Sequence, residues 1–154
     1  MDGFFQWRQE WSLNLEQIDA QHRMLVEAIN RLAPLYVELT KSPGGDIEPR
    51  TKLVAGLNRL YADLEQHFRD EEDLMRDAAY PHHRSHAHAH VMLLAELKSY
   101  CNRIAHRDEE LDMGTLYSLK TWLITHMLDD REVAAHVHAV RGAGVEYGSG
   151  DTGS

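Results

Sequence analysis

Seven polar residues stand at positions where a repeating apolar pattern would place leucine. They are five histidines and two carboxylates: His22, His67, Glu71, His86, His90, His126 and Asp130. A lone histidine on an apolar helix face is most often a hydrogen-bonded core residue. A buried, unpaired carboxylate is harder to explain, because its desolvation is costly. Since imidazoles and carboxylates together can share a cation, the seven residues predict a metal site.

The spacing of these residues supports the same interpretation. Three pairs are four residues apart, HxxxE from His67 to Glu71, HxxxH from His86 to His90, and HxxxD from His126 to Asp130. Residues four apart lie on one face of a helix, about one turn from each other. Five imidazoles and two carboxylates exceed what one tetrahedral zinc uses, whereas two six-coordinate irons need about this many if both carboxylates bridge. A dinuclear iron centre is the leading hypothesis, and a histidine-rich store for zinc or nickel is the alternative.

Four segments with apolar residues at steps of four and three are predicted to position these side chains. The segments are Ile18–Leu39, Leu53–Leu74, His83–Ile104 and Leu116–Val137. The breaks TKSPGGDIEP, DAAYP and HRDEELDMG separate them. HAHAH alternates like a strand, but it lies between a proline and an apolar run of helical period. We therefore predict an all-α fold, an antiparallel up-down-up-down four-helix bundle over residues 1–140 with an N-terminal extended arm. Residues 141–154 are expected to form a flexible tail.

Length, charge and cysteine content narrow the class of protein. With 154 residues, one domain is expected. The net charge of −9 disfavours nucleic acid and anionic membrane as partners. The single cysteine, Cys101, fits a reducing compartment, and neither a signal peptide nor a long apolar span is recognisable. We expect a cytoplasmic monomer.

Several blocks of the sequence match one family in order and spacing. They are W…IDAQHRML around His22, HFRDEEDLM from His67 to Met75, YP followed by HxxxH, and WLITH ending at His126. From about Trp7 to about His136, the chain resembles the bacterial hemerythrins, single-domain oxygen-binding di-iron proteins. HFxxEExLM and the YP block are specific to that family and are not general helix patterns.

The resemblance implies a division of the ligands between two iron ions. His86, His90 and His126 would bind one iron, and His22 and His67 the other. Glu71 and an aspartate would bridge the ions together with an oxo or hydroxo group, and O2 would bind at the iron with fewer ligands. The resemblance also implies that Leu123 and Trp122 line an apolar O2 pocket, although plain core packing is an equal alternative for Trp122.

The chain departs from the family pattern at the second bridging residue. The family has HxxxxD, but the residue five positions after His126 is Arg131. Asp130 is the natural replacement because it continues the apolar stripe, and Asp129 is the fallback. The shorter spacing could shift the bridge, weaken one iron or alter the affinity for O2.

The other six histidines are expected to be solvated. They are His82 and His83 at the start of a helix, His88 on the face opposite the ligands, and His106, His136 and His138 on the surface.

The function implied by the resemblance is reversible O2 binding for storage, transport or buffering, without enzymatic turnover. Oxygen or redox sensing through a partner protein is one alternative, and peroxidase or nitric oxide-reducing activity is another. A carrier would form a lasting O2 adduct that purging removes, whereas an enzyme would consume its adduct and oxidise a reductant.

Overall fold

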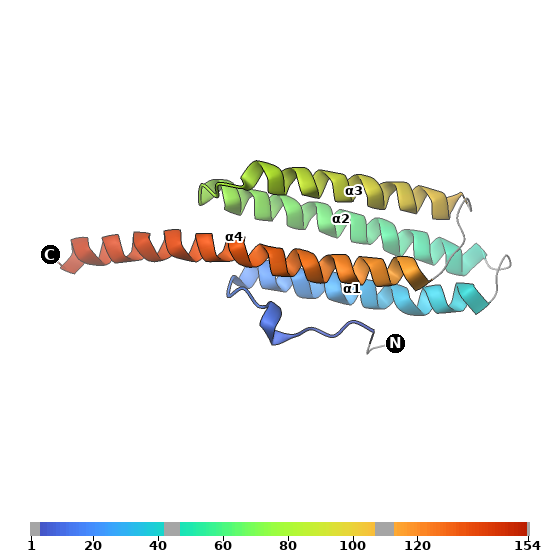
Figure 1. The fold of residues 1–154 in the computed structure, drawn as a ribbon. Coiled ribbons are helices and arrows are strands. Elements are labelled where there is room, and N and C mark those ends of the chain that lie inside the picture. Colours follow the sequence, from blue (N-terminus) through green and yellow to red (C-terminus); the bar gives the residue numbers. More distant parts are fainter. Residues whose placement is uncertain (1–3, 42–46, 107–112, 154) are drawn as a thin grey trace.

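Four helices run side by side, each antiparallel to the one before it (Figure 1). The computed structural model describes residues 4–41, 47–106 and 113–153, with the backbone alone for 143–153. The helices are α1 (Glu16–Lys41), α2 (Ile47–Asp77), α3 (His83–Ala105) and α4 (Met113–Gly153), preceded by the short 3-10 helix η1 (Gln9–Trp11). The predicted up-down-up-down bundle is confirmed, and HAHAH lies within α3.

Leucines at the predicted spacing form the core of the bundle. The residues that are at most 2% exposed include Leu25, Leu32, Leu53, Leu57, Leu60, Leu64, Ile104, Leu116 and Leu123. Each such side chain stabilises the fold by about 1.5–3 kcal/mol through its removal from water. Gly56 lets α2 approach α1 closely, because a Cβ atom at that position would lie 2.7 Å from Cδ2 of Leu32. The apolar stripes therefore fix how the helices face one another.

The N-terminal arm predicted from the sequence packs along the bundle (Figure 1). Phe4, Phe5 and Trp11 are buried in the core. Asn30 on α1 makes two hydrogen bonds to the backbone of Phe5, accepting from its N–H at 2.9 Å and donating to its carbonyl at 2.6 Å. The Lys120 ammonium of α4 donates to the carbonyl of Phe4 at 2.6 Å. The arm thus connects α1 with α4.

The turn between α2 and α3 follows the predicted break at DAAYP. Ala79 adopts a positive φ of 52°, and the N–H of Tyr80 donates to the carbonyl of Met75 at 2.8 Å. Tyr80 is only 8% exposed and belongs to a second apolar cluster with Leu13, Ile18 and Val137. The turn therefore sets where α3 begins relative to α2.

The other predicted boundaries have different outcomes. Parts of the breaks around 42–46 and 107–112 lie outside the described residues. Helix α4 keeps a helical backbone to Gly153, beyond the predicted domain end at residue 140, and its last part projects past the other helices (Figure 1). The flexibility of residues 141–154 stays a prediction. None of the helices, over the part of the chain that is described, combines the length and apolar character needed to cross a membrane.

Candidate metal centre

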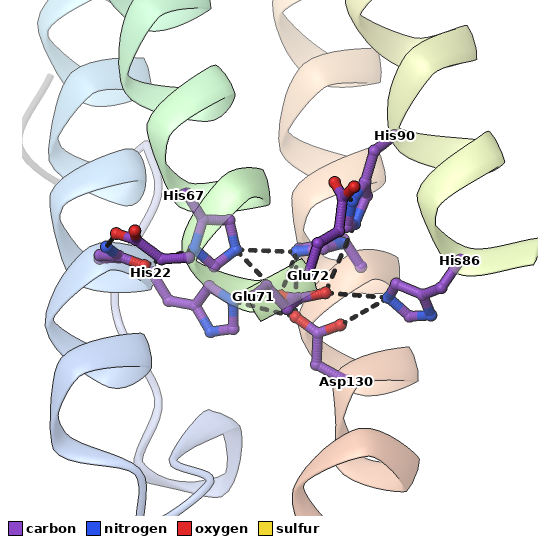
Figure 2. A network of polar contacts seen from close by, with 10 residues as sticks. His22, His67, Glu71, Glu72, His86, His90 and Asp130 are labelled. Atoms are coloured by element: carbon purple, nitrogen blue, oxygen red, sulfur yellow. Dashed lines mark hydrogen bonds and ion pairs between the residues drawn. The ribbon is translucent and has the colours of Figure 1, made fainter. Parts of the chain in front are cut away.

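All seven residues singled out in the sequence meet in the interior of the bundle. Figure 2 labels each of them except His126. Helix α1 supplies His22, α2 supplies His67 and Glu71, α3 supplies His86 and His90, and α4 supplies His126 and Asp130. Six of them are at most 7% exposed, and the His86 side chain is the most accessible at 17%. The 4-3 pattern thus brings one or two polar groups from every helix to the same level of the core.

The five imidazoles point their Nε2 atoms toward the two carboxylates. Glu71 has four of these atoms within 3.6 Å, those of His67 at 3.2 Å, His86 at 2.9 Å, His90 at 3.4 Å and His126 at 3.6 Å. Asp130 has three at close range, those of His22 at 3.1 Å, His86 at 3.1 Å and His126 at 2.9 Å. Two carboxylates therefore lie between nitrogens from four helices.

The potential ligand atoms fall into two overlapping groups, each within a span of 4.8 Å. One contains His22, His67, Glu71, His126 and Asp130, and the other contains Glu71, His86, His90 and His126. Glu71 belongs to both groups, as expected for a carboxylate that bridges two ions. His126 is also shared, whereas the resemblance assigns it to the ion of His86 and His90.

The hydrogen bonds leave lone pairs that a cation would satisfy. His67 Nδ1 lies 2.8 Å from Oε1 of Gln21, whose amide nitrogen donates to Asp70 at 2.6 Å. Because this fixes Gln21 Oε1 as an acceptor, His67 Nδ1 carries the proton and its Nε2 presents a lone pair when the ring is neutral. His90 Nδ1 likewise donates to Glu72 at 2.9 Å, and its buried Nε2 has no hydrogen-bond partner.

The Glu71 carboxylate, which lies between these rings, also lacks well-aligned hydrogen-bond donors. Neither oxygen of Glu71 has a hydrogen bond of acceptable geometry, although imidazole nitrogens lie nearby. Buried polar atoms without partners are rare and call for an explanation such as an ion. Neutral imidazoles and carboxylates on rigid helices are a donor set suited to iron, so the residues fit a metal centre.

Without a metal ion, the carboxylates hold protons on two of the histidines. The hydrogen bond to Asp130 and the Glu71 carboxylate nearby raise the pKa of His86 to about 9. Burial opposes the charge of His126, but the two carboxylates raise its pKa to about 10. Burial works against the Asp130 and Glu71 carboxylates too, yet the charge of His126 lowers the pKa of Asp130 to about 2 and that of Glu71 well below its usual range. Burial lowers the pKa of His67.

Metal binding is expected to release about two protons per chain at pH 7, because His86 and His126 are protonated there and must give up their protons to bind a metal. Because the pKa values of these two histidines are raised, the affinity for the metal increases with pH. The increase is roughly 100-fold per pH unit between pH 7 and pH 8.5. Titration calorimetry with Zn²⁺ in buffers of different ionisation enthalpy measures the number of protons. A value near zero would contradict this protonation state.

Gln21 and Glu72 accept hydrogen bonds from two of the candidate ligand rings, those of His67 and His90. The sequence pattern did not predict this role for either Gln21 or Glu72. Each is the chain neighbour of a ligand position, since Gln21 precedes His22 and Glu72 follows Glu71. Hydrogen bonds to Nδ1 select the tautomer that leaves Nε2 free and fix the orientation of the ring. A polar residue next to a ligand position on a helix is the only sequence signal for this role, and it is weak.

Replacing Glu72 by alanine is expected to weaken metal binding by about 10- to 100-fold, because His90 loses the acceptor that orients it. Competition with a chelator of known affinity measures the change. Asp73→Ala is the matched control, since Asp73 is exposed on the same helix and pairs with Arg76. Equal affinities for the two variants would exclude a positioning role for Glu72.

The geometry distinguishes the two aspartates that follow His126. Asp130 is 1% exposed and lies among three imidazoles. Asp129 is exposed on the wall of a surface cleft. Because successive helical residues differ by about 100° around the axis, only one of the two can face the core. The shortened HxxxD spacing thus still brings a carboxylate to the centre.

The substitution Asp130→Asn is expected to lower the affinity for the more weakly held ion by at least about 100-fold, because the amide has no charge and one oxygen. Asp129→Asn removes the same charge one position away and should leave the amount of bound metal unchanged. Iron and protein quantification after gel filtration compares the two variants. Loss of metal from Asp129→Asn alone would reverse the assignment.

Aromatic and apolar side chains enclose the ligand rings on one side. Trp122 stacks on His126, with centroids 5.2 Å apart and an interplanar angle of 18°, and Phe68 stacks on His90 at 3.8 Å. Trp122 also lines a cavity of about 300 Å³ with Leu97 among its other walls. Leu123 is buried in the core and lines neither this cavity nor the surface cleft. An O2 pocket at Leu123 and Trp122 stays a prediction.

The six remaining histidines are not in the two ligand groups of the described residues. As expected, His82, His88 and His106 are exposed. His136 differs from the expectation, since it is partly buried and its Nε2 lies 2.6 Å from the carbonyl of Ala78 in the α2–α3 turn. His138 is exposed, and its Nε2 lies 2.8 Å from the carbonyl of Leu13. The rings of His136 and His138 thus connect α4 to the α2–α3 turn and to the segment before α1. His83, at the start of α3, also differs from the expectation, since it is partly buried.

Comparison with known proteins agrees with this site. The sequence profile of the hemerythrin HHE cation binding domain matches residues 13–135. The chain therefore belongs to the hemerythrin family. A bacteriohemerythrin of Stenotrophomonas maltophilia is 26% identical over 86% of this chain and 81% of its own length. A bacteriohemerythrin of Clostridium acetobutylicum is 27% identical over 83% and 97%, and a myohemerythrin of Theromyzon tessulatum is 25% identical over 80% and 84%.

Proposed function

We propose that this protein binds O2 reversibly at a di-iron centre and serves in its storage, transport or buffering. The observation that carries the proposal is the pair of overlapping, buried ligand groups that share Glu71. A single ion could not use both groups, because five imidazoles and two carboxylates exceed one coordination sphere. Membership of the hemerythrin family supports iron as the metal.

The side chains divide unequally between the two proposed ions. His86, His90 and His126 would supply three nitrogens to one ion, while His22 and His67 would supply two to the other. When bound, the two ferrous ions would supply the electrons that O2 accepts on binding and returns on release. The ion with fewer protein ligands would leave room for a small molecule.

Burial around the two-histidine side favours binding over consumption of O2. His22 and His67 are at most 1% exposed, and the neighbouring core is apolar. Exclusion of water protects a bound, reactive molecule from protonation and loss. We therefore propose a carrier and not an enzyme.

Consumption of the added substrate separates the carrier from the enzymatic alternatives. The iron-loaded, reduced protein should take up about one O2 per two irons and then stop, even with excess ascorbate present. Continued O2 uptake that depends on the reductant would indicate oxidase turnover. Reductant-dependent consumption of added hydrogen peroxide would indicate a peroxidase, and turnover of added nitric oxide would indicate a reductase. Any of these results would overturn the proposal.

A further inference from the structure

A cleft of about 470 Å³ between α3 and α4 leads from the surface to one side of the centre. The candidate ligands His86, His90 and His126 are among its walls, and so are His82, Asp129 and Glu132, all three of them exposed. The cleft thus joins ligands of the centre to polar groups that the proposed function does not use.

Accessibility differs between the two sides of the centre. His22 and His67 on α1 and α2 have side chains that are 0% exposed. His86, on the wall of the cleft, retains 17% of its side-chain exposure and is the most accessible of the seven candidate ligands. A solute that comes from the cleft would therefore meet His86 first.

The charge of the cleft favours a cation. Its described walls include the carboxylates of Asp129 and Glu132 and contain no lysine or arginine. The protonated rings of His86 and His126 also line it, but each lies beside the buried carboxylates of Glu71 and Asp130, which balance their charge. Arg131, which lies between Asp129 and Glu132 in the sequence, lines a different depression and donates to the carbonyl of Glu10. Clefts lined by one sign of charge raise the local concentration of counter-ions.

A buried acceptor lies at the inner end of the cleft. His90 is 3% exposed and lines the cleft, and its Nε2 has no hydrogen-bond partner. A divalent ion with six water molecules needs roughly 180 Å³ at about 30 Å³ per water, so it fits the cleft with its hydration shell.

We propose that this cleft is the route by which iron(II) reaches the centre. Asp129 and Glu132 attract the hydrated ion at the mouth, and His86 and His90 then exchange its waters for imidazole nitrogens. The bonds broken are those of the ion to water and the N–H bond of the protonated His86, whose proton passes to the solvent. The inference rests on the proposed metal centre, but it concerns the rate of loading and not the final occupancy.

The role of the Asp129 and Glu132 charges can be tested by stopped-flow mixing of metal-free protein with Co²⁺. This ion replaces iron(II) because it does not oxidise in air. The double variant Asp129→Asn/Glu132→Gln should bind Co²⁺ about three- to tenfold more slowly at low ionic strength, with unchanged cobalt content at saturation. The difference in rate between the variant and the unmodified protein should shrink above about 0.1 M salt, because the salt screens charges that lie more than about 10 Å apart. The matched control is Glu27→Gln/Glu38→Gln, which removes two exposed charges from α1.

A steric variant tests the same route independently of charge. Ala89 is exposed and lines the cleft, whereas Ala95 is exposed on α3 beside a different depression. Ala89→Trp should slow cobalt uptake at every salt concentration, and Ala95→Trp should not. Loading rates equal to those of the controls, or a lower final cobalt content in Asp129→Asn/Glu132→Gln, would overturn the route. A protein that binds no cobalt at all would instead refute the proposed metal centre.

Discussion

The Glu71→Ala variant is expected to lose most of its iron, with the affinity for the pair of ions reduced by more than about 100-fold. Glu71 is the carboxylate common to both ligand groups, and its oxygens lie near imidazoles from three helices. Its loss should cost more than the 10- to 100-fold that follows removal of an outer hydrogen-bond partner. Iron per chain after anaerobic loading and gel filtration measures the effect.

The loss of iron must be separated from a loss of fold. Far-ultraviolet circular dichroism should show that Glu71→Ala keeps its helices, because the apolar stripes that hold the bundle together are unchanged, although the loss of one carboxylate from a buried charged cluster lowers the free energy of unfolding by about 3–5 kcal/mol. Asp73→Ala, on the exposed face of α2, serves as the control and should retain two irons. A Glu71→Ala protein with two irons and normal O2 binding would refute the assignment of Glu71.

Removal of the metal is expected to lower the midpoint of thermal unfolding by about 10 °C or more. A ligand present at about 1,000 times its Kd stabilises the folded state by about 4 kcal/mol, and each kcal/mol shifts Tm by about 2–4 °C in a chain of this size. The metal also offsets the desolvation of two buried carboxylates, Glu71 and Asp130. Differential scanning calorimetry with and without a chelator measures the shift.

The pH dependence of this shift has a definite sign. The difference in Tm should shrink as the pH falls from 8 to 6, since protons compete with the metal for His86 and His126. The same chelator should leave the Tm of Glu71→Ala almost unchanged, which makes this variant the control. A metal-free protein as stable as the loaded one would mean that the seven residues do not bind the ions tightly.

The spacing of the apolar residues was enough to predict the bundle. Steps of four and three place Leu25, Leu32, Leu57 and Leu64 on buried faces, and this periodicity depends only on local helix geometry. The same rule placed the seven polar residues on the inner faces, because a ligand at a core position obeys the spacing of the leucine that it replaces. It also favoured Asp130 over Asp129.

Features that depend on contacts between helices were not predictable. The bonds from Gln21 to His67 and from Glu72 to His90 depend on how α1 and α3 are placed against α2. The contact of His136 with the turn at Ala78, like the cleft at Asp129, requires the relative position of distant segments.

Reversible O2 binding is tested by the visible absorption spectrum of the anaerobically reduced, iron-quantified protein. Spectra are recorded before O2, after O2, and again after a purge with argon. We expect two irons per chain, a nearly colourless reduced protein, a charge-transfer band that develops with O2, and loss of that band under argon. A band that never forms, or one that decays at once to a diferric spectrum that argon does not reverse, would contradict reversible O2 binding.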